Sequence, residues 1–167
     1  MPNLMVRLIS VIVASVLLIS RAHAVPFLDE VGNFNVDFPR DLVPIPGPRK
    51  DGRAHTWTAS LAQGQYMSVA YSDAPEGRQL SVESAIKNLA DKMGKIVRVN
   101  HIERHGLAGR EVILLTSDTS VFRWRFFLVG TRLYQVFYRG PSGSETDSEV
   151  EAFLNSFQLL SRDQDNK

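Results

Sequence analysis

Residues 121–140, VFRWRFFLVGTRLYQVFYRG, are the stretch that decides the fold. Two long apolar runs meet at Gly130 and Thr131. A two-residue connection that contains Gly is typical of a tight β-hairpin, because the turn needs a positive φ that Gly adopts without steric cost. We therefore predict two long antiparallel strands joined at this dipeptide.

Counting outward from the turn predicts the register of this hairpin and therefore its two faces. Directly opposed residues share a face, and successive residues alternate between faces. The predicted pairs run from Val129 opposite Arg132 to Arg123 opposite Tyr138. One face is strongly apolar and is expected to be core: Phe122, Trp124, Phe126, Leu128, Leu133 and Phe137. The other face is amphipathic: Arg123, Arg125, Phe127, Val129, Arg132, Tyr134, Val136 and Tyr138.

The first 24 residues have the features of a secretory signal peptide. Arg7 supplies the positive charge, residues 8–19 are mostly apolar, and Ala22-His23-Ala24 has the small-x-small pattern of a cleavage site. A membrane anchor is the alternative, but roughly 20 apolar residues are needed to span a bilayer. We therefore expect cleavage after Ala24 and a periplasmic or extracellular protein that meets the membrane only through its leader during export.

The composition excludes several classes of function. The chain has 167 residues and no Cys, so disulfides, thiolate metal sites and a cysteine nucleophile are excluded. Without the leader the charge is close to neutral, which argues against nucleic acid as a partner. Residues 25–160 fit one globular domain, and residues 161–167 have no apolar side chain and are expected to be a disordered tail.

The remaining chain alternates between strand and helix patterns. Strands are expected at 33–38, 54–61, 65–71, 96–103 and 110–116, in addition to the two strands of the hairpin. One helix is expected after Ser81 and ends before Gly94, and a second follows the capping-box pattern Thr146-x-x-Glu149. The predicted fold class is α+β, an antiparallel sheet of about seven strands flanked by helices on both faces.

This order of elements resembles the PsbP-like family, which is named for an extrinsic subunit of the photosynthetic oxygen-evolving complex. The resemblance rests on AYSDAP at 70–75, GLAGREV at 106–112, RFFLVGTRLYQV at 125–136 and FLNSFQLL at 153–160. It implies an α/β/α sandwich in which the last of these segments is a closing helix. The family includes small exported bacterial proteins without an assigned role, and it implies no catalytic residue set.

The histidines and carboxylates form no catalytic or metal-binding motif. His101 and His105 are spaced as H-x-x-x-H, but along a strand such a pair lies roughly 13 Å apart, too far to share one metal ion. No Ser lies in a G-x-S-x-G elbow, and the spacing pairs none of Asp73, Glu103 and Glu111 with a base. No catalytic residue, cofactor or metal is predicted. A small hydrolase that uses a histidine with Asp73 or Glu103 is the alternative.

The amphipathic face of the hairpin carries the candidate binding site. Arginine forks and tyrosine hydroxyls bind carboxylates, phosphates and acidic protein surfaces, and the residues are Arg123, Arg125, Tyr134 and Tyr138. In the alternative, a helix covers this face, and the arginine heads meet Glu149, Glu151 or solvent. The predicted function is an exported, non-enzymatic binding or envelope-assembly domain, whose partner is a protein or an anionic small ligand.

Overall fold

The computed structural model describes residues 25–39, 42–48, 53–62 and 64–160. The predicted leader and tail lie outside these residues. The strands are β1 (Val25–Asp29), β2 (Phe34–Phe38), β3 (Ile45–Pro46), β4 (Ala54–Ser60), β5 (Tyr66–Asp73), β6 (Lys95–Arg104), β7 (Leu107–Leu115), β8 (Ser120–Val129), β9 (Arg132–Pro141) and β10 (Gln158–Leu159). The helices are α1 (Val82–Met93) and α2 (Ser148–Ser156), with a 3-10 turn at Ser144–Thr146 before α2. No helix in the described part of the chain is long and apolar enough to cross a membrane.

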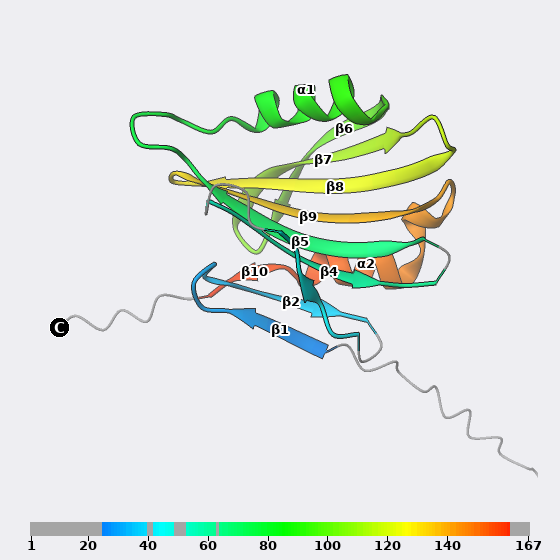
Figure 1. Ribbon diagram of the computed structural model, residues 1–167, viewed down its shortest axis with the longest axis horizontal. Coiled ribbons are helices and arrows are strands. Elements are labelled where there is room, and N and C mark those ends of the chain that lie inside the picture. Colours follow the sequence, from blue (N-terminus) through cyan, green and yellow to red (C-terminus); the bar gives the residue numbers. More distant parts are fainter. Residues whose placement is uncertain (1–24, 40–41, 49–52, 63, 161–167) are drawn as a thin grey trace, which may run out of the picture.

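The predicted hairpin forms the centre of a seven-stranded antiparallel sheet. The strand order is β3-β4-β5-β9-β8-β7-β6, so β9 is the middle strand and β8 is its neighbour (Figure 1). The pairs run from Val129 opposite Arg132 to Arg123 opposite Tyr138, as the sequence predicted. The register is fixed because a slip by one residue would exchange the two unlike faces.

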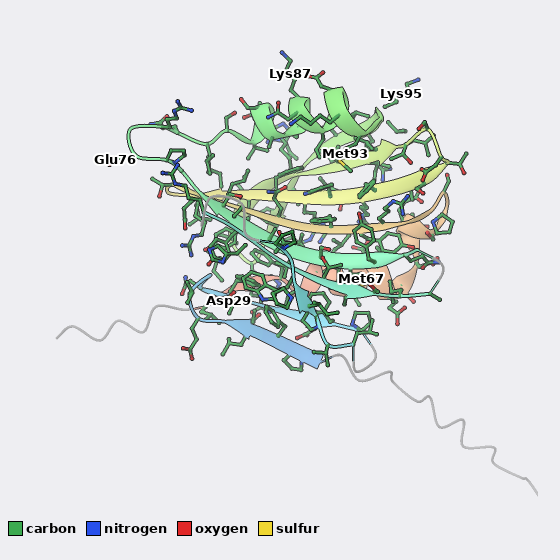
Figure 2. The ribbon with its side chains drawn as sticks, in the orientation of Figure 1. Asp29, Met67, Glu76, Lys87, Met93 and Lys95 are labelled. Carbon is green, nitrogen blue, oxygen red and sulfur yellow. The ribbon has the colours of Figure 1, made fainter. Side chains whose placement is uncertain are left out.

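Helix α1 covers the apolar face of the hairpin. It begins after Ser81, whose hydroxyl accepts a hydrogen bond from the Ser84 amide at 3.2 Å. Its apolar residues pack on buried side chains from β7, β8 and β9. These side chains are Val112, Leu114, Phe122, Trp124, Phe126 and Leu133. Figure 2 shows Met93 between α1 and this sheet, while Met67 belongs to the core on the opposite face. The sequence predicted this helix with Ser81 as its N-cap, whereas the face of the sheet that it covers is known from the structure.

The opposite face of the large sheet is covered by α2 together with a small sheet of order β1-β2-β10 (Figure 1). The molecule therefore has three layers, and the predicted α+β class with helices on both faces is confirmed. The core here is rich in aromatic side chains, and Phe157 stacks on Phe127 with ring centroids 5.5 Å apart. Both faces of the hairpin are thus buried along most of its length.

Four local predictions are wrong. Strand β1 lies before residue 33, where no strand was expected. The predicted closing helix ends at Ser156, and residues 158–159 pair with β2 instead. The cap of α2 is Asp147 rather than Thr146, because residues 144–146 form a 3-10 turn. At the turn end of the hairpin, Leu128 was expected in the core but is exposed, because this end extends past α1 (Figure 1). Val129 on the opposite face is exposed as well.

Candidate functional site

The structure places the four predicted site residues inside the fold. Their exposed fractions are 8% for Arg123, 0% for Arg125, 3% for Tyr134 and 1% for Tyr138. The sequence predicted a binding site on this face of the hairpin, but α2 and the small sheet together cover it. Their polar atoms bond to other parts of the chain, as in the packing alternative.

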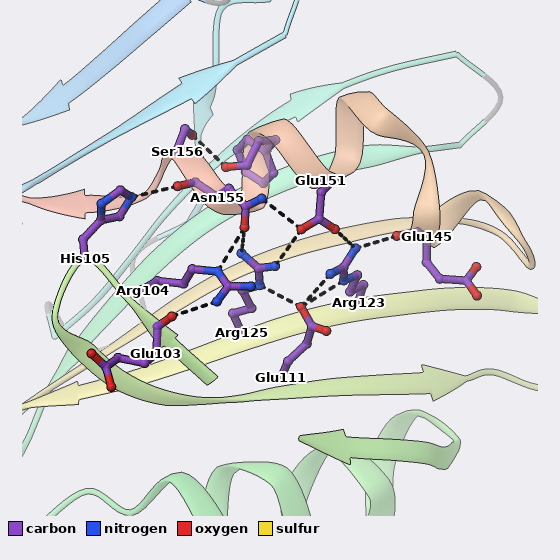
Figure 3. A network of polar contacts seen from close by, with 11 residues as sticks. Glu103, Arg104, His105, Glu111, Arg123, Arg125, Glu145, Glu151, Asn155 and Ser156 are labelled. Carbon is purple, nitrogen blue, oxygen red and sulfur yellow. Dashed lines mark hydrogen bonds and ion pairs between the residues drawn. The ribbon is translucent and has the colours of Figure 1, made fainter. Parts of the chain in front are cut away.

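The two arginines form a buried ion-pair network with acids from β7 and α2 (Figure 3). Glu111 of β7 lies opposite Arg125 in the register, and its Oε2 accepts hydrogen bonds from Arg125 Nε at 2.8 Å and Arg123 Nε at 3.0 Å. Glu151 of α2 pairs with Arg123 at 2.5 Å and with Arg125 at 3.4 Å. The network therefore fastens α2 to the large sheet.

The pKa values in this network follow from burial and pairing. Burial raises the pKa of Glu111, but hydrogen bonds from Arg125 and Arg123 outweigh it, so the net shift is downward. The pKa of Glu151 is lowered by the same balance, with Arg123 and Asn155 as its hydrogen-bond partners. Burial lowers the pKa of Arg125 despite its acidic partners. The acids are thus ionised at neutral pH.

Asn155 of α2 extends the network to the turn between β6 and β7. Its Oδ1 accepts from Arg125 Nη1 at 2.8 Å and from Arg104 Nε at 3.2 Å, and its Nδ2 donates to Glu151 at 2.9 Å. Its carbonyl oxygen lies 3.0 Å from Nε2 of His105. Sequence reasoning missed Asn155 and gave Glu111 no partner. The sequence did contain one indication for Glu111, because an acid within the mostly apolar strand 110–116 needs a buried basic partner.

The two tyrosines join elements that are far apart in the sequence. Tyr138 Oη lies 2.7 Å from Ser144 Oγ and donates to Gln65 Oε1 at 3.2 Å. Tyr134 donates its hydroxyl proton to the Gly32 carbonyl oxygen at 2.8 Å, which ties β9 to the turn between β1 and β2. Tyr134 also lines a groove at the turn end of the hairpin.

A groove of about 750 Å³ lies where the turn between β1 and β2 meets the turn of the β8–β9 hairpin. We call it the hairpin groove. It is lined by residues 30, 31, 33, 73, 129–132, 134 and 159. The lining combines apolar and charged side chains, and it is formed by four segments that are distant in the sequence.

An ion pair is held in a fixed position in the hairpin groove. Arg132 Nε and Nη2 donate to the two carboxylate oxygens of Asp73 at 2.6 and 2.8 Å, and Arg132 Nη1 donates to the Val31 carbonyl oxygen at 2.8 Å. The guanidinium carbon lies 4.3 Å from the ring centroid of Tyr71. The hydrogen bond with Asp73 is the main cause that raises the pKa of Arg132. Both side chains remain partly exposed.

The histidines of the hydrolase alternative lie apart from one another. His101 contacts Arg110, which pairs with Glu83 of α1, whereas His105 contacts the backbone of α2 on the other side of the large sheet. The carboxylate of Asp73 is engaged by Arg132. Within the described residues, no group of three His, Asp or Glu side chains is arranged to hold a metal ion.

Comparison with solved structures identifies the architecture. The solution structure of cyanobacterial PsbP (CyanoP) from Synechocystis superposes with a TM-score of 0.63 at 11% identity, over 85% of this chain and 95% of that one. The chain has a PsbP-like fold. A crystal structure of a protein from Bacteroides thetaiotaomicron also superposes on this chain, with a TM-score of 0.53 at 9% identity, over 84% of this chain and 50% of that one. No family model and no curated protein matches the sequence.

Proposed function

We propose that this PsbP-like chain is an exported, non-enzymatic binding domain and that the hairpin groove is its ligand site. The observation that carries the proposal is the Asp73–Arg132 pair, which the protein itself holds in place within a groove of about 750 Å³. Sites for small ligands are largely preformed and have volumes of roughly 300–1,000 Å³. The features of the leader support export.

The charges of the groove favour a ligand with a cationic group. Glu30 and Asp73 carry two negative charges against the single positive charge of Arg132. Three N–H groups of Arg132 already donate to protein oxygens, whereas an ionised carboxylate has about four lone-pair sites and Asp73 uses two of them for Arg132. The ligand therefore donates hydrogen bonds to Asp73 and Glu30. An anionic ligand was predicted from Arg123 and Arg125, which are buried and paired.

The apolar part of the lining favours a ligand whose cationic group is attached to an aliphatic chain. Val31, Val129 and Leu159 border the charged pair, and Val31 and Val129 are exposed side chains. A short aliphatic chain beside an amine or guanidinium would cover this surface. Such a group occurs in free amines and in the Lys and Arg side chains of an envelope protein.

The proposal is tested by titrating the chain without its leader with agmatine, and with pentanoate as an anionic ligand of similar length. We expect agmatine to shift the amide resonances of residues 30–33 and 129–132, and pentanoate to leave them in place. Glu30→Gln should weaken agmatine binding roughly fivefold, since one ion pair near 4 Å in water contributes on the order of 1 kcal/mol. The control Glu103→Gln removes an exposed acid from β6 and should bind as the parent does.

The two sources of the cationic group are separated by a third probe, a capped pentapeptide with one central Arg between Gly residues. Binding of the peptide without binding of agmatine would indicate a protein partner. If neither probe shifts the groove resonances at millimolar concentration, the groove is not the ligand site. A substrate-panel screen tests the enzyme alternative, since activity abolished by His101→Ala or His105→Ala would overturn the non-enzymatic assignment.

A further inference from the structure

We infer that the outer edge of β6 is a docking site for an acidic, extended segment of a partner protein, which pairs with β6 as an additional strand. This inference does not depend on the hairpin groove, which lies at the closed end of the β8–β9 hairpin. It rests on the open backbone of β6, on its regular register and on the side chains that flank it.

The backbone of β6 is open along one side. Strand β6 ends the order of the large sheet and pairs with β7 alone among the described strands. In an antiparallel ladder, about half of the N–H and C=O groups of an edge strand point away from its neighbour. The Glu103 carbonyl oxygen accepts a hydrogen bond from Arg104 Nη1 at 2.7 Å, and a further strand would pair with the other outward groups.

The two edges of the large sheet differ in length and chemistry. The opposite edge is β3, which has two residues, one of them Pro46, a residue without an N–H group. Strand β6 has ten residues, and after a bulge between Ile96 and Arg98 its register with β7 is unbroken from Arg98 to Arg104. This run is longer than a typical strand of 5–6 residues. Only the β3 edge is therefore short and interrupted enough to resist strand addition.

The side chains of β6 define the chemistry of the partner. Lys95 and Arg98 are exposed and lie opposite Leu115 and Ile113, on the face of the sheet that α2 covers elsewhere. On the α1 face, Val99 lies opposite Val112 and is 45% exposed. Val97 lies at the bulge and is 62% exposed. A segment that alternates acidic and apolar residues places its acids beside Lys95 and Arg98 and its apolar side chains beside Val99.

The charges of β6 disfavour a second copy of the chain as the occupant. Pairing of two β6 strands would bring Lys95, Arg98 and Arg104 of each copy to one shared edge, and β6 has Glu103 as its sole acid. Like charges on neighbouring strands are destabilising. An acidic strand has no such repulsion, so charge complementarity selects it.

The test uses the full chain without its leader and a capped eight-residue peptide of alternating Glu and Val. We expect the peptide to slow hydrogen exchange of β6 amides between residues 97 and 103 and to bind in a fluorescence anisotropy titration. A version of the peptide with alternate amides N-methylated should lose both effects, because it cannot complete the ladder. A version with Lys in place of Glu should bind at least about tenfold more weakly.

Two matched double variants reverse the sign of two positive charges, one pair on β6 and the other pair on α1. The double variant Lys95→Glu and Arg98→Glu should weaken binding about tenfold or more. The control Lys87→Glu and Lys92→Glu makes the same charge change at exposed positions of α1 and should bind normally (Figure 2 labels Lys87 and Lys95). Absence of β6 protection, or binding that survives N-methylation, would overturn the inference. Self-association that protects β6 without peptide would identify a second copy as the occupant and overturn the acidic partner.

Discussion

Removing the charge of Glu111 tests whether the buried network holds α2 on the sheet. Glu111→Gln keeps the size of the side chain but leaves Arg123 and Arg125 with one acidic partner, Glu151. Breaking a buried ion pair by removing one partner costs about 3–5 kcal/mol, because the remaining charge stays desolvated. Glu151 still compensates both arginines in part and is itself partly exposed. We therefore expect a loss near the lower end, about 3 kcal/mol.

The pH dependence of the Glu111→Gln effect has a definite sign. The pKa of Glu111 is lowered from its ordinary value of 4.5 in the folded protein. A lowered pKa gives stabilisation that is present above the unfolded-state value and is lost as the pH falls through the folded-state value. The difference in unfolding free energy between the parent and Glu111→Gln should therefore be constant near neutrality and shrink below pH 4.5.

The measurement is urea unfolding of the parent, Glu111→Gln and the control Glu103→Gln at neutral and acidic pH. Glu103 is an exposed acid eight positions earlier, and its change should alter the unfolding free energy by less than about 0.5 kcal/mol. If Glu111→Gln loses less than about 1 kcal/mol at neutral pH while the fold is intact, the network does not fasten α2 in the way that its geometry indicates.

Three further substitutions test the packing of the layers, each measured by urea unfolding. Phe157→Ala should cost about 3–5 kcal/mol, because it removes a buried ring that stacks on Phe127, and a loss below about 1 kcal/mol would contradict this packing. Gly109→Ala should cost at least about 1–3 kcal/mol, since a Cβ there would lie 2.4 Å from the Phe126 carbonyl oxygen; a neutral result would contradict this close approach. Ser81→Ala should cost about 1 kcal/mol and increase hydrogen exchange in the first turn of α1, and unchanged exchange would show that the cap is not needed.

The register of the hairpin could be predicted from the sequence because its determinants are local. A two-residue turn at Gly130 and Thr131 fixes which residues oppose one another, and unlike faces prevent a slip. Helix α1 was predictable for the same reason, since its cap and apolar stripe lie within one segment. The PsbP-like fold was predicted from the order of such local elements, and the superposition on cyanobacterial PsbP confirms it.

The small sheet could not be predicted because its partners are distant and short. Strand β10 has two residues and pairs with β2 across more than a hundred positions of sequence. No periodicity can be detected in two residues, so residues 158–159 were assigned to the preceding helix. The hairpin groove could not be predicted for the same reason, because it is formed by distant segments near residues 31, 73, 131 and 159.

Because Arg123 and Arg125 are buried, the candidate binding sites lie at the turn end of the hairpin and at the edge of the large sheet, not in the middle of the hairpin. A charged side chain in the interior is tolerated only when its charge and hydrogen bonds are compensated, and Glu111, Glu151 and Asn155 supply this compensation. A ligand that used these arginines would have to displace α2 and the core residues packed beneath it. Partly exposed charges next to apolar surface occur instead at Asp73 and Arg132 in the groove and along β6 at the sheet edge. These two places can bind a ligand or a partner strand without unfolding a layer of the protein.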